Sequence, residues 1–266
     1  MRALAISIAI ILLTVSIGAA SQGLTIVARV TSDDGTTTTT TNYIAEDHAR
    51  WSGGTEGEMI LDAKAAEMIM INNGKKTYSV LTKKDIETLS ARIQEQMNSP
   101  EMKRAQEAMK NLPPEQRQRM QAAMGSMMSM NVEKLGSSHT IAGHKCEDWV
   151  VTMGQMTKTV QCMSTDVQFP PQAWTMYRDF ANSMKSLMGS MGPMKSNMDS
   201  MMEQMKKMKG IPLSSKTTTT IMGRTSVSST EVTDIKNGSI PDSVWQVPAG
   251  YTKVDNPMTK ELARKR

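Results

Sequence analysis

Residues 67–82 read "EMIMINNGKKTYSVLT", and this stretch decides the fold class that the sequence predicts. Two strand-like runs, 67–72 and 76–81, flank the dipeptide Asn73-Gly74. Asn-Gly is favoured where both central residues of a tight β-turn adopt positive φ. We therefore expect a β-hairpin with a two-residue turn, and an antiparallel sheet built from such neighbouring strands.

The same strand-forming composition continues on both sides of this hairpin. Residues 24–30 are rich in β-branched side chains, and Asp33-Asp34-Gly35 predicts a turn before the threonines of 36–41. Further strands are expected within 43–62, 132–165, 213–221, 225–235 and 240–254. A total of about eleven strands predicts the α+β class, with one curved antiparallel sheet that forms an incomplete β-barrel.

Two helical insertions interrupt the strands, at 83–130 and 171–209. In the first of them Met, Gln, Glu, Ala and Arg replace Thr, Val and Ile, which favours helix. Pro113-Pro114 divides this insertion, because proline is accepted in the first turn of a new helix but not inside an established one. We expect both insertions to cover the concave face or an edge of the sheet.

Methionine forms a stripe along both insertions. In the second, apolar residues alternate at spacings of four and three, which is a heptad seam: Phe180, Met184, Leu187, Met191, Met194, Met198, Met201, Met205 and Met208. In the first, the stripe contains Met102, Met109, Met120 and Met127. We predict that these residues form a lid that faces something apolar.

The stripes allow more than one interpretation. One interpretation is that each stripe simply packs on the other stripe and on the sheet. Static packing normally uses Leu and Ile, whose rotamers are better defined, whereas methionine suits a surface that must adapt to apolar partners of differing shape. The alternative is a Cu(I) or Ag(I) site, because these soft ions prefer thioethers. Its ligands would be Met191, Met194, Met198 and Met201, with His144 near the cysteines. The interpretation of the stripes as an adaptable apolar lid requires no cofactor.

The N-terminus predicts export. Arg2 precedes an apolar run at 3–15, and small residues at 18–20 predict signal-peptide cleavage after Ala20. We expect a periplasmic or secreted domain at 21–256 and a basic tail at 257–266. The mature chain has 30 Lys and Arg against 26 Asp and Glu, a net charge of +4, which gives no case for nucleic-acid binding.

The two cysteines predict a disulfide. Cys146 and Cys162 lie on the two arms of a hairpin centred on Gly154, where folding sets them opposite each other. No HExxH, GxSxG, P-loop, GxGxxG or CxxC motif occurs, and no carboxylate pair is placed for general acid–base work. We therefore expect a protein that is not an enzyme.

Several short motifs resemble a bacterial secreted family, domain of unknown function 4412. They are NGKKTY at 73–78, PPEQ at 113–116, IAGHKC at 141–146, GIPL at 210–213 and IPDSVWQVPAGY at 240–251. The family is similar in layout to the outer-membrane lipoprotein carriers (LolA-like half-barrels), whose curved sheet and helical lid hold acyl chains. The resemblance brings no catalytic residue with it.

The function that we expect is binding or chaperoning of a hydrophobic ligand, a lipid or an acylated protein, under the methionine lid. Peripheral contact with the envelope membrane is a further expectation. A Cu(I)/Ag(I)-binding protein and a purely structural envelope protein are the alternatives.

Overall fold

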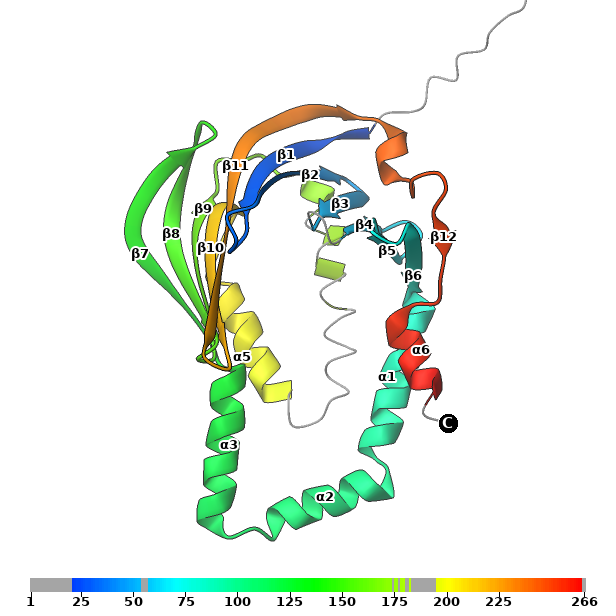
Figure 1. The fold of residues 1–266 in the computed structure, drawn as a ribbon, viewed down its shortest axis with the longest axis vertical. Coiled ribbons are helices and arrows are strands. Elements are labelled where there is room, and N and C mark those ends of the chain that lie inside the picture. The colour runs from blue at the N-terminus through cyan, green and yellow to red at the C-terminus, as the bar shows by residue number, and fades with distance from the viewer. Residues whose placement is uncertain are drawn as a thin grey trace, which may run out of the picture.

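The computed structural model describes residues 21–53, 57–173, 175–176, 178–179, 182 and 195–264. Its strands form one open, strongly curved sheet (Figure 1), in the order β12-β6-β5-β4-β3-β2-β1-β11-β10-β9-β8-β7. The first six strands are β1 (Ser21–Thr31), β2 (Thr37–Ala45), β3 (His48–Ser52), β4 (Glu58–Asp62), β5 (Glu67–Asn72) and β6 (Thr77–Thr82). The others are β7 (Met130–Ile141), β8 (His144–Met153), β9 (Thr157–Ser164), β10 (Ile211–Ile221), β11 (Arg224–Ile240) and β12 (Thr252–Lys253).

The strand order places β1 in the middle of the sheet, paired with β2 on one side and β11 on the other. As a result β6 and β7, which are consecutive in the chain, lie near opposite ends of the sheet. Three helices connect them: α1 (Lys83–Met97), α2 (Pro100–Lys110) and α3 (Pro114–Met128). Figure 1 shows this chain of helices crossing the open side of the curved sheet, with α2 farthest from the strands.

Local sequence signals explain where these helices begin. Thr82 ends β6 and caps α1, because its hydroxyl accepts a hydrogen bond from the Asp85 amide while the Asp85 carboxylate accepts one from the Thr82 amide. Ser99 caps α2, and Pro114 opens α3 as the paired prolines predicted. Further along the described residues lie α5 (Lys195–Met205), the 3-10 turn η2 (Asp242–Trp245) and α6 (Pro257–Arg264).

Alternating side chains of the central strands build the core. Leu24, Ile26 and Ala28 of β1 are buried on one face and pack with Ile44, Leu213 and Val232 of the neighbouring strands. The register shifts between Val27 and Ala28, and again between Pro212 and Ser214. Such bulges bend a strand and increase its twist, which is how a sheet of this size curls instead of staying flat.

The structure corrects three expectations. The sheet has twelve strands, not eleven, and β12 pairs with β6 in parallel. The 67–82 hairpin forms, but its turn has four residues, 73–76, and the positive φ lies at Lys76 (49°), not at Asn73 and Gly74. The segment predicted as a basic tail is helical as α6 and contacts α1.

Gly210 explains why the chain needs glycine where it enters β10. Its φ is +89°, and a Cβ placed there would lie 1.9 Å from the carbonyl oxygen of Ser164. Ser164 is the β9 partner of Ile211, so this close approach sets the first pair of the β9–β10 ladder. The glycine of the GIPL motif is therefore needed because the backbone of β10 approaches the backbone of β9 at this point.

We predict that Gly210→Ala lowers the free energy of unfolding by about 2 kcal/mol or more, because it adds a steric clash to the cost of a positive φ. Gly223→Ala is the matched control, since Gly223 has a similar φ of +78° and no atom within 4 Å of its Cβ position. It should lose only about 1 kcal/mol. Equal losses in urea unfolding would show that the contact with Ser164 costs nothing.

The 240–251 motif forms a strap that is tied back to the sheet. Arg50 of β3 contacts the Glu58 carboxylate at 2.5 Å and donates a hydrogen bond to the Val244 carbonyl at 2.6 Å. Trp245 of the strap stacks on His48 at a centroid distance of 5.2 Å. The Tyr251 hydroxyl donates to the side chain of Asn73 at 3.0 Å. Arg50 thus links the strap to the sheet.

We predict that Arg50→Gln lowers the free energy of unfolding by about 2 kcal/mol at neutral pH, because it leaves the half-buried Glu58 carboxylate without its cation. Burial raises the pKa of Glu58, but the hydrogen bonds from Arg50 and Asn73 outweigh burial and lower it. The contribution is therefore present above the usual Glu pKa and is lost as pH falls through the lowered value.

Urea unfolding of the two proteins at neutral and acid pH measures this difference. The difference in the free energy of unfolding between wild type and Arg50→Gln should become smaller below about pH 4. A gap that stays constant down to about pH 3 would contradict the assignment to this ion pair.

Candidate functional site

The middle of the concave face is occupied by the chain itself. The segment that follows β9 enters the curve of the sheet, where Val167, Ala173 and Met176 are buried in the main core and Phe169 packs against it. Ala173 is fully buried, and Met176 is 5% exposed. The start of the second insertion therefore covers the sheet, upstream of the methionine stripe that we expected in this role.

An apolar pocket of about 360 Å³, the Met176 pocket, lies beside this segment. Its floor is a cross-strand row, because Leu61 of β4 pairs with Met68 of β5 and Met68 pairs with Leu81 of β6. All three side chains are buried. Ile86 of α1, Met176 and two alanines of the β4–β5 turn complete the apolar lining. The volume is at the lower end of the ~300–1,000 Å³ typical of ligand pockets.

Polar side chains form the rim of the Met176 pocket: Asp62, Glu67, Lys83 and Asp179. The Asp62 carboxylate accepts a hydrogen bond from the Ala65 amide at 2.9 Å and lies 3.4 Å from His48 Nε2. His48 also contacts the Asp47 carboxylate at 2.6 Å. Burial raises the pKa of Asp47, but hydrogen bonds from Lys64 and His48 outweigh it and lower the pKa. These groups join the β2–β3 turn to the β4–β5 turn beside the pocket.

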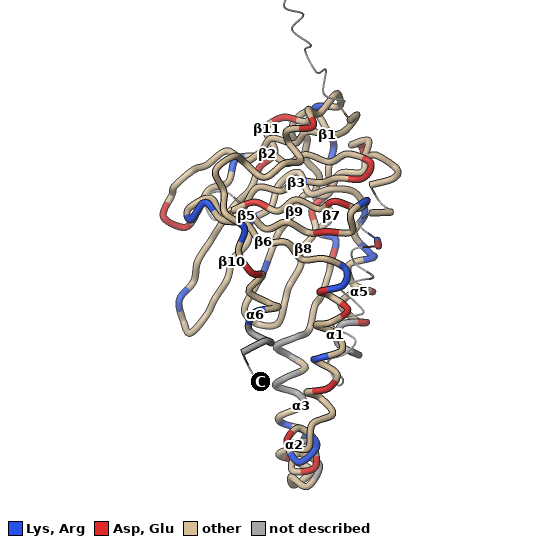
Figure 2. The backbone as a smooth tube through the Cα atoms, turned by 90° about the vertical axis from the view of Figure 1, so that its right-hand side faces the viewer, with Lys and Arg blue, Asp and Glu red and all other residues tan. Residues whose placement is uncertain are grey.

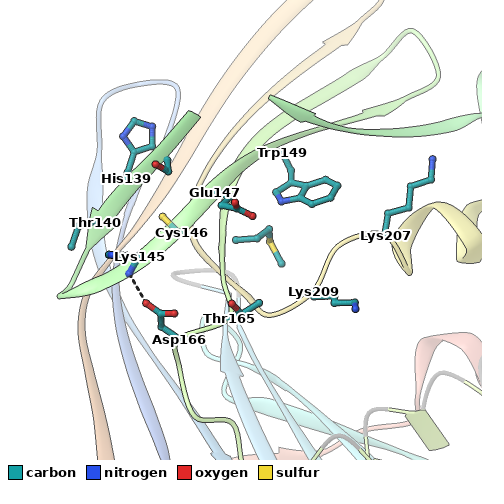
Figure 3. A pocket seen from close by; sticks show the side chains of 12 residues that line it. His139, Thr140, Lys145, Cys146, Glu147, Trp149, Thr165, Asp166, Lys207 and Lys209 are labelled. Atoms are coloured by element: carbon teal, nitrogen blue, oxygen red, sulfur yellow. Dashed lines mark hydrogen bonds between the residues drawn. The ribbon is translucent and has the colours of Figure 1, made fainter. Parts of the chain in front are cut away.

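A second pocket, the Trp149 pocket, has a volume of about 650 Å³ and lies at the other end of the sheet (Figure 3). Strand β8 contributes Lys145, Glu147 and Trp149, and the connection from α5 to β10 contributes Lys207 and Lys209. Figure 3 shows the indole of Trp149 between the Glu147 carboxylate and Lys207, with Lys209 on the same flank as Lys207. This pocket is more polar than the Met176 pocket.

The predicted methionine stripes are only partly within the described residues. Met102 and Met109 of α2 are 37% and 40% exposed, and Met205 of α5 is 47% exposed. Met120 and Met201 are half-buried, and Met208 accepts a hydrogen bond from the Gln161 side chain at 2.9 Å. Five lie outside the described residues: Phe180, Met184, Leu187, Met191 and Met194. The structure places the side chains of neither Met127 nor Met198.

The described part of the first stripe does not lie over the sheet. Helix α2 occupies the far end of an elongated molecule, where acidic and basic residues are mixed along the backbone (Figure 2). Helix α5 is different, because it contacts β7. Met208, in the connection after α5, contacts the side chain of Gln161 on β9. Of the two stripes, the second therefore reaches the sheet at its described end. A complete lid over the sheet stays a prediction.

The disulfide between Cys146 and Cys162 is formed, with a Cα–Cα distance of 5.3 Å. The prediction that the two residues lie directly opposite each other is wrong, because Cys162 pairs with Asp148. The bond leaves no thiol to join His144 in a copper site. Among the described residues no cluster of His, Cys, Asp and Glu could hold a metal ion. The thioether site at Met191, Met194, Met198 and Met201 stays a prediction.

Apart from Cys146, sequence reasoning did not name the residues that line the two pockets as site residues. One signal was present for Met176, since it precedes Phe180 by four residues and would therefore lie on the same face of a helix. The row Leu61–Met68–Leu81 depends on strand register. The position of Lys207 in the same pocket as Trp149 depends on how α5 packs on the sheet. No local motif reports either arrangement.

A curved, open sheet of mainly antiparallel strands, with a helical bridge across its open side and an apolar pocket between sheet and helix, defines an α+β half-barrel. The chain belongs to the family described as "Domain of unknown function (DUF4412)", whose profile matches residues 101–251. This confirms the resemblance drawn from the motifs. No curated protein matches the chain.

Solved structures resemble the chain only distantly. An uncharacterized conserved protein from Thermus thermophilus has a TM-score of 0.40 and 6% identity, over 89% of this chain and 91% of that one. The MucA/MucB complex of Pseudomonas aeruginosa has a TM-score of 0.41 and 11% identity, over 88% of this chain and 58% of that one. A LolA superfamily protein from Nitrosomonas europaea has a TM-score of 0.21 and 10% identity, over 85% and 90%. At such scores these similarities carry no argument about function.

Replacing Met191, Met194, Met198 and Met201 together by leucine tests what the thioethers of the predicted metal site do. Leucine keeps the apolar area, so we expect binding of a neutral hydrophobic dye to stay within about twofold and unfolding to change by less than about 1.5 kcal/mol. Cu(I) titration against a competing chelator is the second measurement. A loss of Cu(I) affinity of about tenfold in the leucine variant would favour the metal alternative instead.

Proposed function

We propose that this protein is a non-enzymatic, periplasmic or secreted protein that binds or chaperones a hydrophobic ligand, a lipid or the acyl chain of an acylated protein. The ligand enters the Met176 pocket, and the methionine-bearing helices act as its adaptable lid. The observation that carries the proposal is the continuous apolar lining contributed by three strands, by α1 and by Met176.

The lining is suited to an alkyl chain. Leu61, Met68 and Leu81 present three adjacent apolar side chains, so specificity there depends on shape and apolar area. Met68 and Met176 are unbranched and can change rotamer to follow a chain. The polar groups of the rim would remain in water beside the ligand's polar end.

Helix α1 is the fixed side of the pocket. Its capping box joins it to β6, and Leu89, Ile86 and Ile93 pack with Met68 and Leu81 in a second hydrophobic cluster. By contrast, α2 presents Met102 and Met109 to solvent. An apolar helix face at the open side of the sheet supplies contact area for a ligand that extends beyond the pocket.

Two features support an exported location. The disulfide is typical of proteins that fold in an oxidising compartment outside the cytosol. The N-terminal run, which lies outside the described residues, has the pattern of a cleaved signal peptide. Of the helices in the described part of the chain, none combines the length and apolarity that a membrane span requires.

A pocket-filling substitution tests the proposal. We predict that Ile86→Trp raises the Kd of the neutral dye N-phenyl-1-naphthylamine by about tenfold or more, because the indole occupies the space that the ligand needs. Dye fluorescence in a titration of the mature chain measures this affinity.

Ile93→Trp is the matched control, since Ile93 lies two helical turns along the same face of α1 but does not line the pocket. It should leave the Kd within about twofold, because it leaves the Met176 pocket open. Equal affinities for the two variants, with both folded by circular dichroism, would place dye binding elsewhere and overturn the proposal.

A further inference from the structure

The Trp149 pocket combines an apolar wall with unpaired positive charge. Trp149 of β8 pairs with Gln161 of β9, and Glu147 pairs with Met163, so these four side chains share one face. The Gln161 amide donates to the sulfur of Met208, which brings the connection after α5 against this face. Lys207 and Lys209 flank Met208 in sequence and both line the pocket.

The two carboxylates of the pocket lining have partners other than Lys207 and Lys209. Glu147 forms an ion pair with Lys134 at 2.8 Å, outside the pocket lining. The Asp166 carboxylate accepts a hydrogen bond from the Lys145 amide at 3.1 Å, which Figure 3 shows as a dashed line. Lys207 donates to the neutral side chain of Gln204 at 2.7 Å. Within the described residues, Lys207 and Lys209 form no ion pair, so the flank keeps its positive charge.

The apolar and cationic parts are adjacent. Met163 is 9% exposed and Trp149 is half-buried, so one wall of the pocket is apolar and partly open to solvent. An alkyl chain placed along this wall would bring an attached anion to the lysine flank. Ammonium groups bind phosphate and carboxylate as point charges, and their attraction is strengthened beside an apolar wall that excludes water.

We propose that the Trp149 pocket binds an anionic amphiphile, with its phosphate or carboxylate head between Lys207 and Lys209 and its alkyl chain against Trp149 and Met163. This site lies at the opposite end of the sheet from the Met176 pocket, and it does not depend on the function proposed there.

The test titrates dodecyl phosphate, at concentrations below micelle formation, into the full mature chain and follows tryptophan fluorescence. Lys207→Gln combined with Lys209→Gln should weaken binding by about tenfold or more. Lys206→Gln is the matched control, because Lys206 is the neighbouring exposed lysine, pairs with Glu203 and does not line the pocket. It should leave the affinity within about twofold. Trp149→Phe should remove most of the fluorescence change.

Two further ligands separate the parts of the proposal. Dodecyl maltoside carries the same chain with a neutral head, and inorganic phosphate carries the head alone; both should bind more weakly than dodecyl phosphate by about tenfold or more. Equal binding of the maltoside would show that charge is not recognised. Equal binding of inorganic phosphate would show a simple anion site. An unchanged affinity in the double lysine variant would overturn the proposal outright.

The two pockets are tested independently. The double lysine variant should bind the neutral dye as wild type does, and Ile86→Trp should bind dodecyl phosphate as wild type does. Loss of dodecyl phosphate binding in Ile86→Trp would assign both ligands to the Met176 pocket and contradict a separate site.

Discussion

The antiparallel ladder between β1 and β11 is the interaction on which the rest of the structure depends. It joins the first described strand to a strand that begins at Arg224, from the pair Ser21–Ile240 to the pair Thr31–Ser229. Because this pairing brings the first and the second-last strand together in the middle of the sheet, β6 and β7 lie toward its opposite ends. The helices between them must then cross the open side.

This topology also determines where ligands can bind. The central concave face is filled by Val167, Ala173 and Met176, so the two pockets lie to either side of that segment. The Met176 pocket lies toward β6, where three register-matched apolar residues meet α1. The Trp149 pocket lies toward β7, where α5 leads into Lys207 and Lys209. One pocket is mainly apolar and the other is partly cationic, which follows from the strands and loops that line each one.

Turn chemistry shows how a correct local prediction can still give a wrong register. The hairpin at 67–82 is present, but a two-residue turn at Asn73-Gly74 would pair Asn72 with Lys75, and the structure pairs Asn72 with Thr77. The strap at 240–251 accounts for the difference in part, since Tyr251 bonds to Asn73 and the Thr252 amide bonds to the Lys76 carbonyl. True two-residue turns with paired positive φ occur at Ala142-Gly143 and Met222-Gly223. Tertiary contacts therefore contribute to the turn type, in addition to the local sequence.

The sequence by itself determined the elements: strand periodicity, helix caps, the proline break, the cysteine pair and the family motifs are all local signals. It did not determine the Leu61–Met68–Leu81 row, the partners of His48 or the meeting of Trp149 with Lys207. Those arrangements require strands and helices distant in sequence to pack together, and their register is set by bulges, turn length and side-chain contacts that form only in the folded chain. The α2 methionines illustrate the limit, because an amphipathic spacing predicts an apolar face, whereas only the tertiary structure decides what, if anything, that face contacts.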